Sequence, residues 1–435
     1  MSKPPRIALV NPYFRTRAAT ELLFPPLGLA ALEAQLRNRR LETQIFDCTF
    51  QTMGQLEMSL RSFQPDILGI TSIVTLVNNT FNIARLVRDI LPECLLVAGG
   101  AMPTLYPERF SQHLDAVFCG EADLNFPQFC QDYLVHHLNR EKLGELPLEM
   151  YKGLYIKQNH LETINPIVHH SESEIQSFPI IDRSDFNHSA YQEVWDIKFG
   201  KKTTSLITTL GCPFNCDFCS RPVFGNLFRR RNLDTIILEI DQIQKLGYDN
   251  LWIADDNFTL SLPFLTNFCQ RIAQRKLGWS CLSRSTGVSN TMAQMMKEAG
   301  CQRVYLGLET GSENTLKVMN KQATLEEGIN AVLLFHRAGI EVAGFFIVGY
   351  PGETRADIEE TFKISLNLPL DEISFNVPYP LPGSKLFERV VDLDSEKDWK
   401  EENEITFIYK SEFNPDWLRQ RINETMQAFA LKKRS

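Results

Sequence analysis

Three cysteines with close spacing are the residues of this chain that most clearly suggest chemistry. Cys212, Cys216 and Cys219 stand four and three residues apart in the stretch LGCPFNCDFCSRP. Three thiolates can hold a cubic four-iron cluster at three corners and leave the fourth iron open to an outside ligand. Gly211 and Pro213 favour a tight loop in which the three sulfurs converge. The pattern therefore predicts a [4Fe-4S] site with one free coordination position.

Two other interpretations of the three thiols stay open at this point. A structural zinc site needs a fourth protein ligand and usually includes a second C-x-x-C pair. The sequence has no second pair, although His169 and His170 could be recruited. The thiols could also be unrelated. The other seven cysteines stand singly, mostly in apolar runs, and are expected to be buried small hydrophobic residues: Cys48, Cys94, Cys119, Cys130, Cys269, Cys281 and Cys301.

The cysteines directly follow a short apolar strand, TSLITT, which begins a regular alternation of strands and helices. Further strands are predicted at NLWIAD, GWSCLS, RVYLGLE, VAGFFIVG and EISFNVP, with amphipathic helices between them. Six strand–helix repeats suffice for a partial (β/α)6 version of the TIM barrel, whose closed form has eight. Chemistry in such folds lies at the carboxyl ends of the strands, which is where the cysteine loop is expected.

The first part of the chain alternates in the same way. Strands are predicted at RIALVN, TQIFD, DILGITS, LLVAGG and AVFCG, with helices such as PPLGLAALEAQLRN between them. Short apolar strands separated by helices imply a parallel sheet covered on both faces. The fold class is thus α/β, with an N-terminal Rossmann-like domain, a partial barrel and a small C-terminal segment. The predicted domains are residues 1–140, a linker at 141–202 that contains a small hairpin, the barrel at 203–380, and a substrate-capping segment at 381–435.

Length and charge exclude several other classes of protein. The chain has 435 residues, 43% of them hydrophobic, and a formal net charge of −8. This composition suits two or three globular domains and gives no indication of a nucleic-acid partner. The sequence shows no apolar run of membrane-spanning length and no signal peptide, so a cytoplasmic protein is expected. Five aromatic residues near the C-terminus are interpreted as core rather than as pocket lining: Trp399, Phe407, Tyr409, Phe413 and Trp417.

The pattern C-x-x-x-C-x-aromatic-C at the head of a strand–helix barrel resembles the radical S-adenosylmethionine (SAM) superfamily. The resemblance implies that the open iron chelates the amino and carboxylate groups of SAM, and that one electron cleaves SAM to a 5′-deoxyadenosyl radical. It also implies a set of SAM-binding residues, one from each strand-end motif or from the cysteine motif: Phe218, Asp255 or Asp256 in WIADDNF, Arg284 in SRSTG, Glu309 in GLETGS, and Val348 in FFIVGYPGET.

Three of these positions have other possible roles or partners. Asp256 or Asn257 could instead cap a helix. Arg284 could instead make a surface ion pair. Glu309 could bind a ribose hydroxyl, an NH group or Arg284.

The N-terminal stretches NPYF, FPPLGLAALEAQLR, PDILGITSIVTLVNN, VAGGAMPTLYPE and DAVFCGEAD are similar to the cobalamin-binding domain of class B radical SAM methyltransferases. The resemblance implies cobalamin contacts from residues at the ends of the third to fifth strands: Thr71, Ser72, Thr75, Leu76, Gly99, Gly100 and Glu121. The D-x-H-x-x-G motif that supplies a cobalt ligand elsewhere is absent, and His113 lacks the right neighbours. An ordinary Rossmann-like sheet is the alternative; a nucleotide is disfavoured because no G-x-G-x-x-G follows the first strand.

The two resemblances together imply an anaerobic enzyme with a [4Fe-4S] cluster, SAM and cobalamin as cofactors. The expected reaction is methyl transfer from SAM, through methylcobalamin, to an unactivated carbon of a small molecule or of a peptide or protein side chain. An electron donor such as flavodoxin or ferredoxin is the expected partner. The alternatives are a non-methylating rearrangement, cyclisation or oxidation with the same cofactors, a methylthiotransferase, which would need a second cysteine triad, and a non-enzymatic corrinoid or cluster sensor.

Overall fold

The computed structural model describes residues 5–15, 22–158, 161–390 and 409–434. The chain divides into two compact units. The first comprises residues 1–204, 222–225 and 229–248, and the second comprises residues 205–221, 226–228 and 249–435.

The first unit is built on a seven-stranded sheet with the strand order β2-β1-β3-β4-β5-β6-β7. Its first five strands are parallel to one another. They are β1 (Arg6–Asn11), β2 (Glu42–Asp47), β3 (Ile67–Thr71), β4 (Leu95–Gly99) and β5 (Ala116–Phe118). The order reverses between β1 and β3, and open α/β sheets bind ligands at such a reversal, outside the carboxyl ends of the strands.

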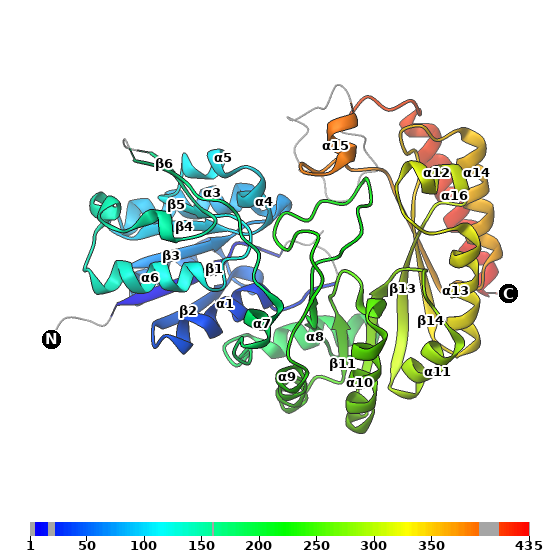
Figure 1. Ribbon diagram of the computed structural model, residues 1–435, viewed down its shortest axis with the longest axis horizontal. Coiled ribbons are helices and arrows are strands. Elements are labelled where there is room, and N and C mark those ends of the chain that lie inside the picture. Colours follow the sequence, from blue (N-terminus) through cyan, green and yellow to red (C-terminus); the bar gives the residue numbers. More distant parts are fainter. Residues whose placement is uncertain (1–4, 16–21, 159–160, 391–408, 435) are drawn as a thin grey trace. The chain divides into compact units, whose positions relative to one another are not determined.

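Helices cover both faces of this sheet, as predicted (Figure 1). Alternate residues of β1 point to opposite faces: Ile7 and Leu9 join one hydrophobic cluster, whereas Ala8 and Val10 join another. The first cluster contains α1 (Leu27–Asn38) and α6 (Asn125–Val135). The second contains helices that follow the next three strands, α2 (Met53–Phe63), α3 (Val77–Ile90), α4 (Ala101–Leu105) and α5 (Pro107–Ser111).

The segment predicted as a linker contributes to the first sheet. Strands β6 (Leu154–Gln158) and β7 (Leu161–Ile164) form the expected hairpin, and β6 pairs with β5 in an antiparallel manner. Since β5 has only three residues and would leave its backbone groups unpaired, the hairpin protects that edge. The predicted linker also contains α7 (Glu172–Gln176) and α8 (His188–Phe199). It is therefore a folded part of the first unit.

The second sheet has six strands in the order β15-β14-β13-β12-β11-β8. The five strands from β11 to β15 are parallel to their neighbours, as an open, partial barrel requires. The strands are β8 (Thr203–Leu206), β11 (Asn250–Ile253), β12 (Gly278–Ser283), β13 (Cys301–Glu309), β14 (Glu341–Ile347) and β15 (Glu372–Asn376). Each coincides with a strand predicted from the sequence. Two short strands, β9 (Thr209–Leu210) and β10 (Arg229–Arg230), lie between β8 and the next long helix.

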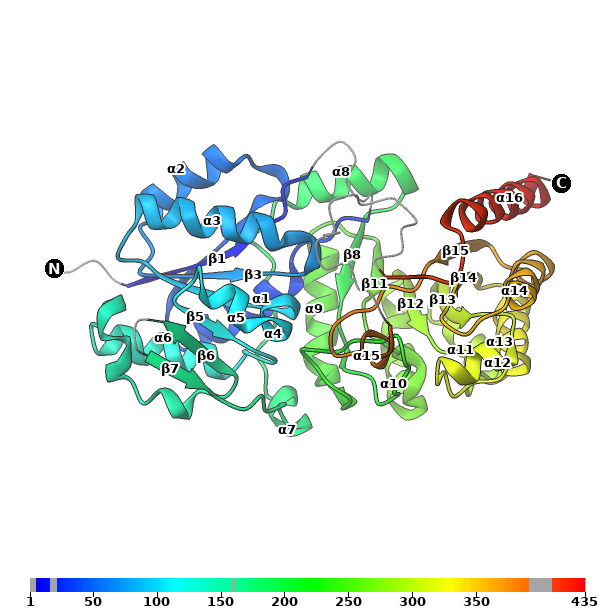
Figure 2. The same cartoon turned by 90° about the horizontal axis from the view of Figure 1, so that it is seen from above.

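The helices of the barrel region follow the strands in sequence. They are α9 (Leu233–Lys245), α10 (Leu262–Ile272), α11 (Asn290–Glu298), α12 (Glu313–Val318), α13 (Leu325–Arg337), α14 (Arg355–Asn367), α15 (Lys385–Arg389) and α16 (Pro415–Arg434). The last helix, α16, lies alongside α14 (Figure 2), and Arg421 on α16 pairs with Glu359 on α14 at 2.6 Å. Short 3-10 helices span Cys48–Phe50, Val74–Leu76, Arg140–Glu145, Leu148–Met150, Phe258–Leu260 and Ala273–Arg275.

The aromatic side chains of the C-terminal segment agree only in part with the core interpretation, because Tyr409 and Phe413 also line a cavity beside Gly349 and Arg389. Tyr409 and Phe413 are buried, whereas Trp417 is partly exposed. Trp399 and Phe407 lie outside the described residues. Within the described ranges, no helix combines the length and the apolar character that crossing a bilayer demands.

Candidate functional site

The cysteine loop begins directly after β9, and its shape is fixed by hydrogen bonds within the second unit. Gly211 has φ +76°, a left-handed conformation that suits glycine. Arg221 donates from Nη1 to the carbonyl oxygens of Cys212, at 2.6 Å, and Phe214. The amide of Asn320 donates to the carbonyl oxygen of Asn215 at 2.7 Å. Hydrogen bonds from Arg221, close by in the chain, and from Asn320, in a distant turn, thus fix the conformation of the loop.

The three thiols of this loop differ from all the other cysteines. Cys212, Cys216 and Cys219 are partly exposed, whereas the seven single cysteines are buried, as predicted. Burial raises the pKa of Cys219 to about 11, and the neighbouring thiols contribute in the same direction. In the part of the chain that is described, no three His, Cys, Asp or Glu side chains converge on one metal ion. A cubic cluster fits this donor set, because each thiolate binds a different iron.

Phe218, the aromatic residue of the cysteine motif, packs between two side chains of the same unit. Its ring meets that of Tyr350 edge-on, with centroids 6.4 Å apart, and Lys321 Nζ lies 6.0 Å from its centroid. These contacts fix the ring beside the thiols. Its predicted contact with SAM stays a prediction.

The structure distinguishes the two aspartates after β11. Asp255 is buried and accepts three hydrogen bonds: from the backbone N–H of Thr208 at 2.6 Å, from its hydroxyl at 2.5 Å, and from the Thr209 hydroxyl at 2.7 Å. Asp256 is exposed. Asn257 occupies the N-cap position of the 3-10 helix that follows, as the alternative allows, but its side chain makes no capping hydrogen bond, and Asp256 does not occupy that position. Asp255 therefore connects the end of β11 to the segment around the start of β9, and a contact of Asp256 with SAM stays a prediction.

Asp256→Asn is expected to weaken SAM binding roughly tenfold, because a hydrogen bond to a charged group contributes about 1.5–3 kcal/mol. The measurement is equilibrium binding of SAM to the reconstituted chain under anaerobic conditions. Asp255→Asn serves as the matched control: it should lower the melting temperature more than Asp256→Asn does. If Asp255→Asn reduced SAM affinity and Asp256→Asn did not, the assignment would be reversed.

Arg284, which follows β12, is buried, so the surface-ion-pair alternative is wrong. Its guanidinium lies over the ring of Phe214, 3.8 Å from the centroid. Nη1 donates to Cys216 Sγ at 3.3 Å, and Nη2 donates to the carbonyl oxygens of Lys321 and, at 3.4 Å, of Gln322. Arg284 therefore lies in contact with the cysteine loop, as a residue near SAM and the cluster should.

Glu309 is buried at the end of β13 and adopts φ +65°. A non-glycine residue in this region costs roughly 1–3 kcal/mol, and such strain is common at binding sites. The carboxylate pairs with the buried Lys321 rather than with Arg284. Lys321 stands between Asn320 and Gln322, both of which also have positive φ. Sequence reasoning missed Lys321, because nothing in the local pattern marks a lysine twelve residues after the strand as the partner of Glu309.

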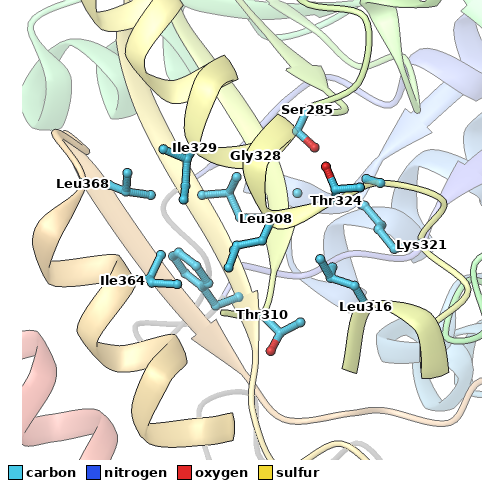
Figure 3. A pocket seen from close by; sticks show the side chains of 14 residues that line it. Ser285, Leu308, Thr310, Leu316, Lys321, Thr324, Gly328, Ile329, Ile364 and Leu368 are labelled. Atoms are coloured by element: carbon cyan, nitrogen blue, oxygen red, sulfur yellow. The ribbon is translucent and has the colours of Figure 1, made fainter. Parts of the chain in front are cut away.

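A small cavity lies close to this ion pair, between β13 and β14 and the helices that cover them (Figure 3). Leu308, Ile329, Ile364 and Leu368 make its wall apolar, and Lys321 lies at its rim. It leaves about 10 Å³ for the centre of a water molecule, close to what a single water needs. The cavity is thus a packing gap and is too small for a nucleoside.

The motif GYPGET follows β14 and contains a buried carboxylate. Glu353 accepts hydrogen bonds from the backbone N–H groups of Gly349, at 2.8 Å, and Tyr350, at 2.9 Å. The preceding Val348 is fully buried, and its own N–H donates to Asn376 at 2.9 Å. Burial raises the pKa of Glu353 to about 7.

This raised pKa predicts a pH dependence of stability. A carboxyl group that binds its proton more tightly in the folded state destabilises the fold as pH rises from its unfolded pKa, 4.5, to about 7. The loss is at most about 1.4 kcal/mol per pH unit. Glu353→Gln should therefore show a flatter decline of unfolding free energy over this range than the wild-type chain, measured by urea denaturation. Equal slopes would contradict the prediction.

In the first unit, the residues predicted to bind cobalamin lie at the carboxyl edge of the sheet. Thr71 is partly exposed and Thr75 is exposed, so their hydroxyls are available. Ser72 is fully buried and accepts a hydrogen bond from Thr80 at 3.1 Å, and Leu76 is also buried. Thr71 and Thr75 are thus more exposed at this edge than Ser72 and Leu76, and the cobalamin contacts predicted for all four stay predictions.

The two glycines after β4 have different roles. A Cβ atom at Gly99 would meet only the Phe118 carbonyl oxygen, at 3.9 Å, which is an ordinary contact. At Gly100, φ is +106° and a Cβ atom would come within 2.9 Å of the Ser72 carbonyl oxygen. Packing of the chain therefore requires glycine at position 100 but not at position 99, and the cobalamin contacts predicted for both residues stay predictions.

Glu121 is buried and its carboxylate is engaged by protein groups. Arg229 approaches one carboxylate oxygen at 2.6 Å and donates to the other at 2.9 Å, and the His170 backbone N–H donates at 2.7 Å. His169 Nδ1 lies 3.5 Å from the same carboxylate. The two histidines considered as zinc ligands thus lie at this ion pair, and the cobalamin contact of Glu121 stays a prediction.

Comparison with known proteins identifies two families along the chain. Residues 206–364 match the radical SAM superfamily, and residues 16–129 match the B12 binding domain. The matched ranges contain the cysteine loop and the carboxyl edge of the first sheet, respectively. The cofactors predicted from the sequence, a [4Fe-4S] cluster, SAM and cobalamin, are those of these two families.

The chain is also similar to individual proteins over most of its length. A protein of Pyrococcus horikoshii named as a methyltransferase, PH0819, is 28% identical, over 94% of this chain and 88% of the relative. The anaerobic magnesium-protoporphyrin IX monomethyl ester cyclase of Rubrivivax gelatinosus is 24% identical, over 98% of this chain and 78% of the cyclase. The fold is similar to that of the radical SAM methyltransferase TsrM from Kitasatospora setae, solved with cobalamin and a [4Fe-4S] cluster. That similarity has a TM-score of 0.75 at 17% identity, over 88% of this chain and 74% of TsrM.

The order of the two matched families, with the three thiols at the head of the second, is the arrangement that the sequence predicted. The chain therefore combines a B12 binding domain with a radical SAM region, and it is similar to cobalamin-dependent radical SAM methyltransferases.

Proposed function

We propose that the chain transfers a methyl group from SAM to an unactivated carbon of a small molecule or of a peptide or protein side chain. One observation carries the proposal: the cysteine loop opens the radical SAM region of a chain that also has a B12 binding domain. The bound cofactors supply a radical that removes a hydrogen atom and a methyl group that replaces it. The protein supplies binding, orientation and exclusion of water.

The second unit would bind the cluster and SAM. Cys212, Cys216 and Cys219 would each hold one iron, and Asp256 would accept a hydrogen bond from the SAM ammonium group. The buried cation of Arg284 would attract the SAM carboxylate, which is favourable because few water molecules compete there. Further contacts are proposed for Phe218, Glu309 and Val348, which lie at the ends of neighbouring strands or in the cysteine loop.

The first unit would bind cobalamin along the carboxyl edge of its sheet. Thr71 and Thr75 offer hydroxyl groups, and Gly99 has no side chain that would hinder a flat ring. We propose that a low-potential electron donor of the flavodoxin or ferredoxin type reduces the cluster and that the enzyme works in the cytoplasm without oxygen.

A second candidate is a non-methylating reaction with the same cofactors, such as a cyclisation or an oxidation. The similarity to the anaerobic cyclase over 98% of this chain favours it. The fold does not separate the two reactions, because both need a radical formed at the same loop. Products must distinguish them.

The test is anaerobic reconstitution with iron, sulfide and cobalamin, followed by mass spectrometry of candidate acceptors with SAM labelled at its methyl carbon. Methyl transfer predicts both 5′-deoxyadenosine and a labelled product, and omission of cobalamin should remove the labelled product. Formation of 5′-deoxyadenosine with an altered but unlabelled acceptor would favour the second candidate. Neither product, from a chain that holds its cluster, would indicate a sensor.

A further inference from the structure

Asp217 is a buried carboxylate inside the cysteine motif, between Cys216 and Phe218, and nothing described so far uses its side chain. The Tyr350 hydroxyl donates to Asp217 Oδ2 at 2.5 Å, and Arg389 Nη2 donates to the same oxygen at 2.6 Å. The backbone is held as well: the Asp217 N–H donates to the Met319 carbonyl oxygen at 2.8 Å, and its own carbonyl oxygen accepts from the Leu386 N–H at 2.9 Å.

These contacts connect the cysteine loop to two separate elements of the second unit. Tyr350 follows β14, and Arg389 is the last residue of α15. Tyr350, Met319 and Leu386 are fully buried and form one hydrophobic cluster, against which Phe218 packs. The Arg389 guanidinium also lies 5.7 Å from the centroid of the Tyr350 ring. The loop that carries the thiols is therefore held at the buried Asp217 by the neutral Tyr350 hydroxyl and by the charged Arg389 guanidinium.

The negative charge of Asp217 lies next to the proposed cluster ligands along the chain, and Arg389 is paired with it. Adjacent Cα atoms are about 3.8 Å apart, so the Asp217 backbone stands one residue from Cys216 and two from Cys219. The reduction potential of an iron–sulfur cluster depends on the net charge, hydrogen bonding and solvent exposure around it. A carboxylate beside the cluster opposes the addition of an electron, and a cation paired with that carboxylate compensates for it.

We infer that Asp217 is a positioning residue of the cysteine loop and that its ion pair with Arg389 sets the reduction potential of the cluster. The step concerned is the uptake of one electron by the oxidised cluster from a low-potential donor protein. The inference rests on the proposed cluster site at the three cysteines. It assigns α15, within the C-terminal segment, a part in controlling that electron transfer.

The experiment measures the midpoint potential of the cluster by electron paramagnetic resonance during redox titration of the full, reconstituted chain. The iron and sulfide content of each sample is determined as well. Asp217→Asn should shift the potential to more positive values, because it removes a negative charge and keeps an acceptor for Tyr350. Arg389→Met should shift it to more negative values, by less, because this side chain is 41% exposed and partly screened. The double variant should lie between them. Tyr350→Phe keeps the ring contact with Phe218 and should shift the potential negatively.

Arg421→Met is the matched control, because it breaks an ion pair on α16 that does not touch the loop, and it should leave the potential unchanged. Shifts of the same sign in Asp217→Asn and Arg389→Met, or no shift, at full iron content would overturn the inference. If Asp217→Asn failed to hold iron, the potential of Arg389→Met would decide whether the inference holds. An unchanged cluster potential in Arg389→Met would refute the inference. A wild-type chain without iron would refute the proposed cluster site itself, which is a distinguishable result.

Discussion

Replacing Cys212, Cys216 and Cys219 together with alanine is expected to remove the iron and sulfide of the reconstituted chain and to abolish SAM cleavage. The loss of turnover should be at least about a thousand-fold, because no other group supplies the electron that cleaves SAM. The absorbance of the cluster near roughly 400 nm should disappear with the iron. Cobalamin should still bind, since its predicted contacts belong to the other unit.

The matched control is Cys269→Ala, which removes a buried thiol from α10 of the same unit. Iron content and SAM cleavage should be kept, and only a modest loss of stability is expected. Retained cleavage of SAM in the triple variant would contradict the radical SAM assignment of these thiols. Zinc in place of iron in oxygen-protected wild-type chain would contradict it as well.

Replacing Arg229 with methionine is expected to destabilise the first unit by roughly 3–5 kcal/mol, because it leaves the Glu121 carboxylate buried without its cation. For a unit of about 200 residues this corresponds to a fall in melting temperature of roughly 10 °C. Differential scanning calorimetry of the full chain measures it. The double variant Glu121→Gln/Arg229→Met should recover much of the loss, since no buried charge then remains unpaired.

Arg61→Met is the control for this second prediction. It breaks an exposed pair with Glu57 on α2, and such pairs contribute less than about 1 kcal/mol. If Arg229→Met were as harmless as this control, the buried ion pair would not stabilise the unit. The double variant also tests the predicted role at cobalamin: weaker cobalamin binding by Glu121→Gln/Arg229→Met, in which no buried charge is left unpaired, would support a direct contact of Glu121 with the ligand.

The positions of the strands and of the cysteine loop could be read from the sequence alone. Strand β1 begins and ends where the apolar run RIALVN does, and each strand of the second sheet coincides with a predicted apolar run. Local periodicity suffices for this, because neighbouring residues decide which side chains point to the same face. The family, too, follows from local motifs such as the cysteine spacing.

The partners of individual side chains were decided only by the tertiary structure. Asp255 and Asp256 are chemically identical neighbours. The Asp255 carboxylate nevertheless accepts hydrogen bonds from two threonines that precede it by 46 and 47 residues, while Asp256 stays exposed. Glu309 pairs with Lys321, and Glu121 pairs with Arg229, 108 residues away along the chain. Such pairings depend on which distant segments the two sheets bring together, and no local pattern carries that information.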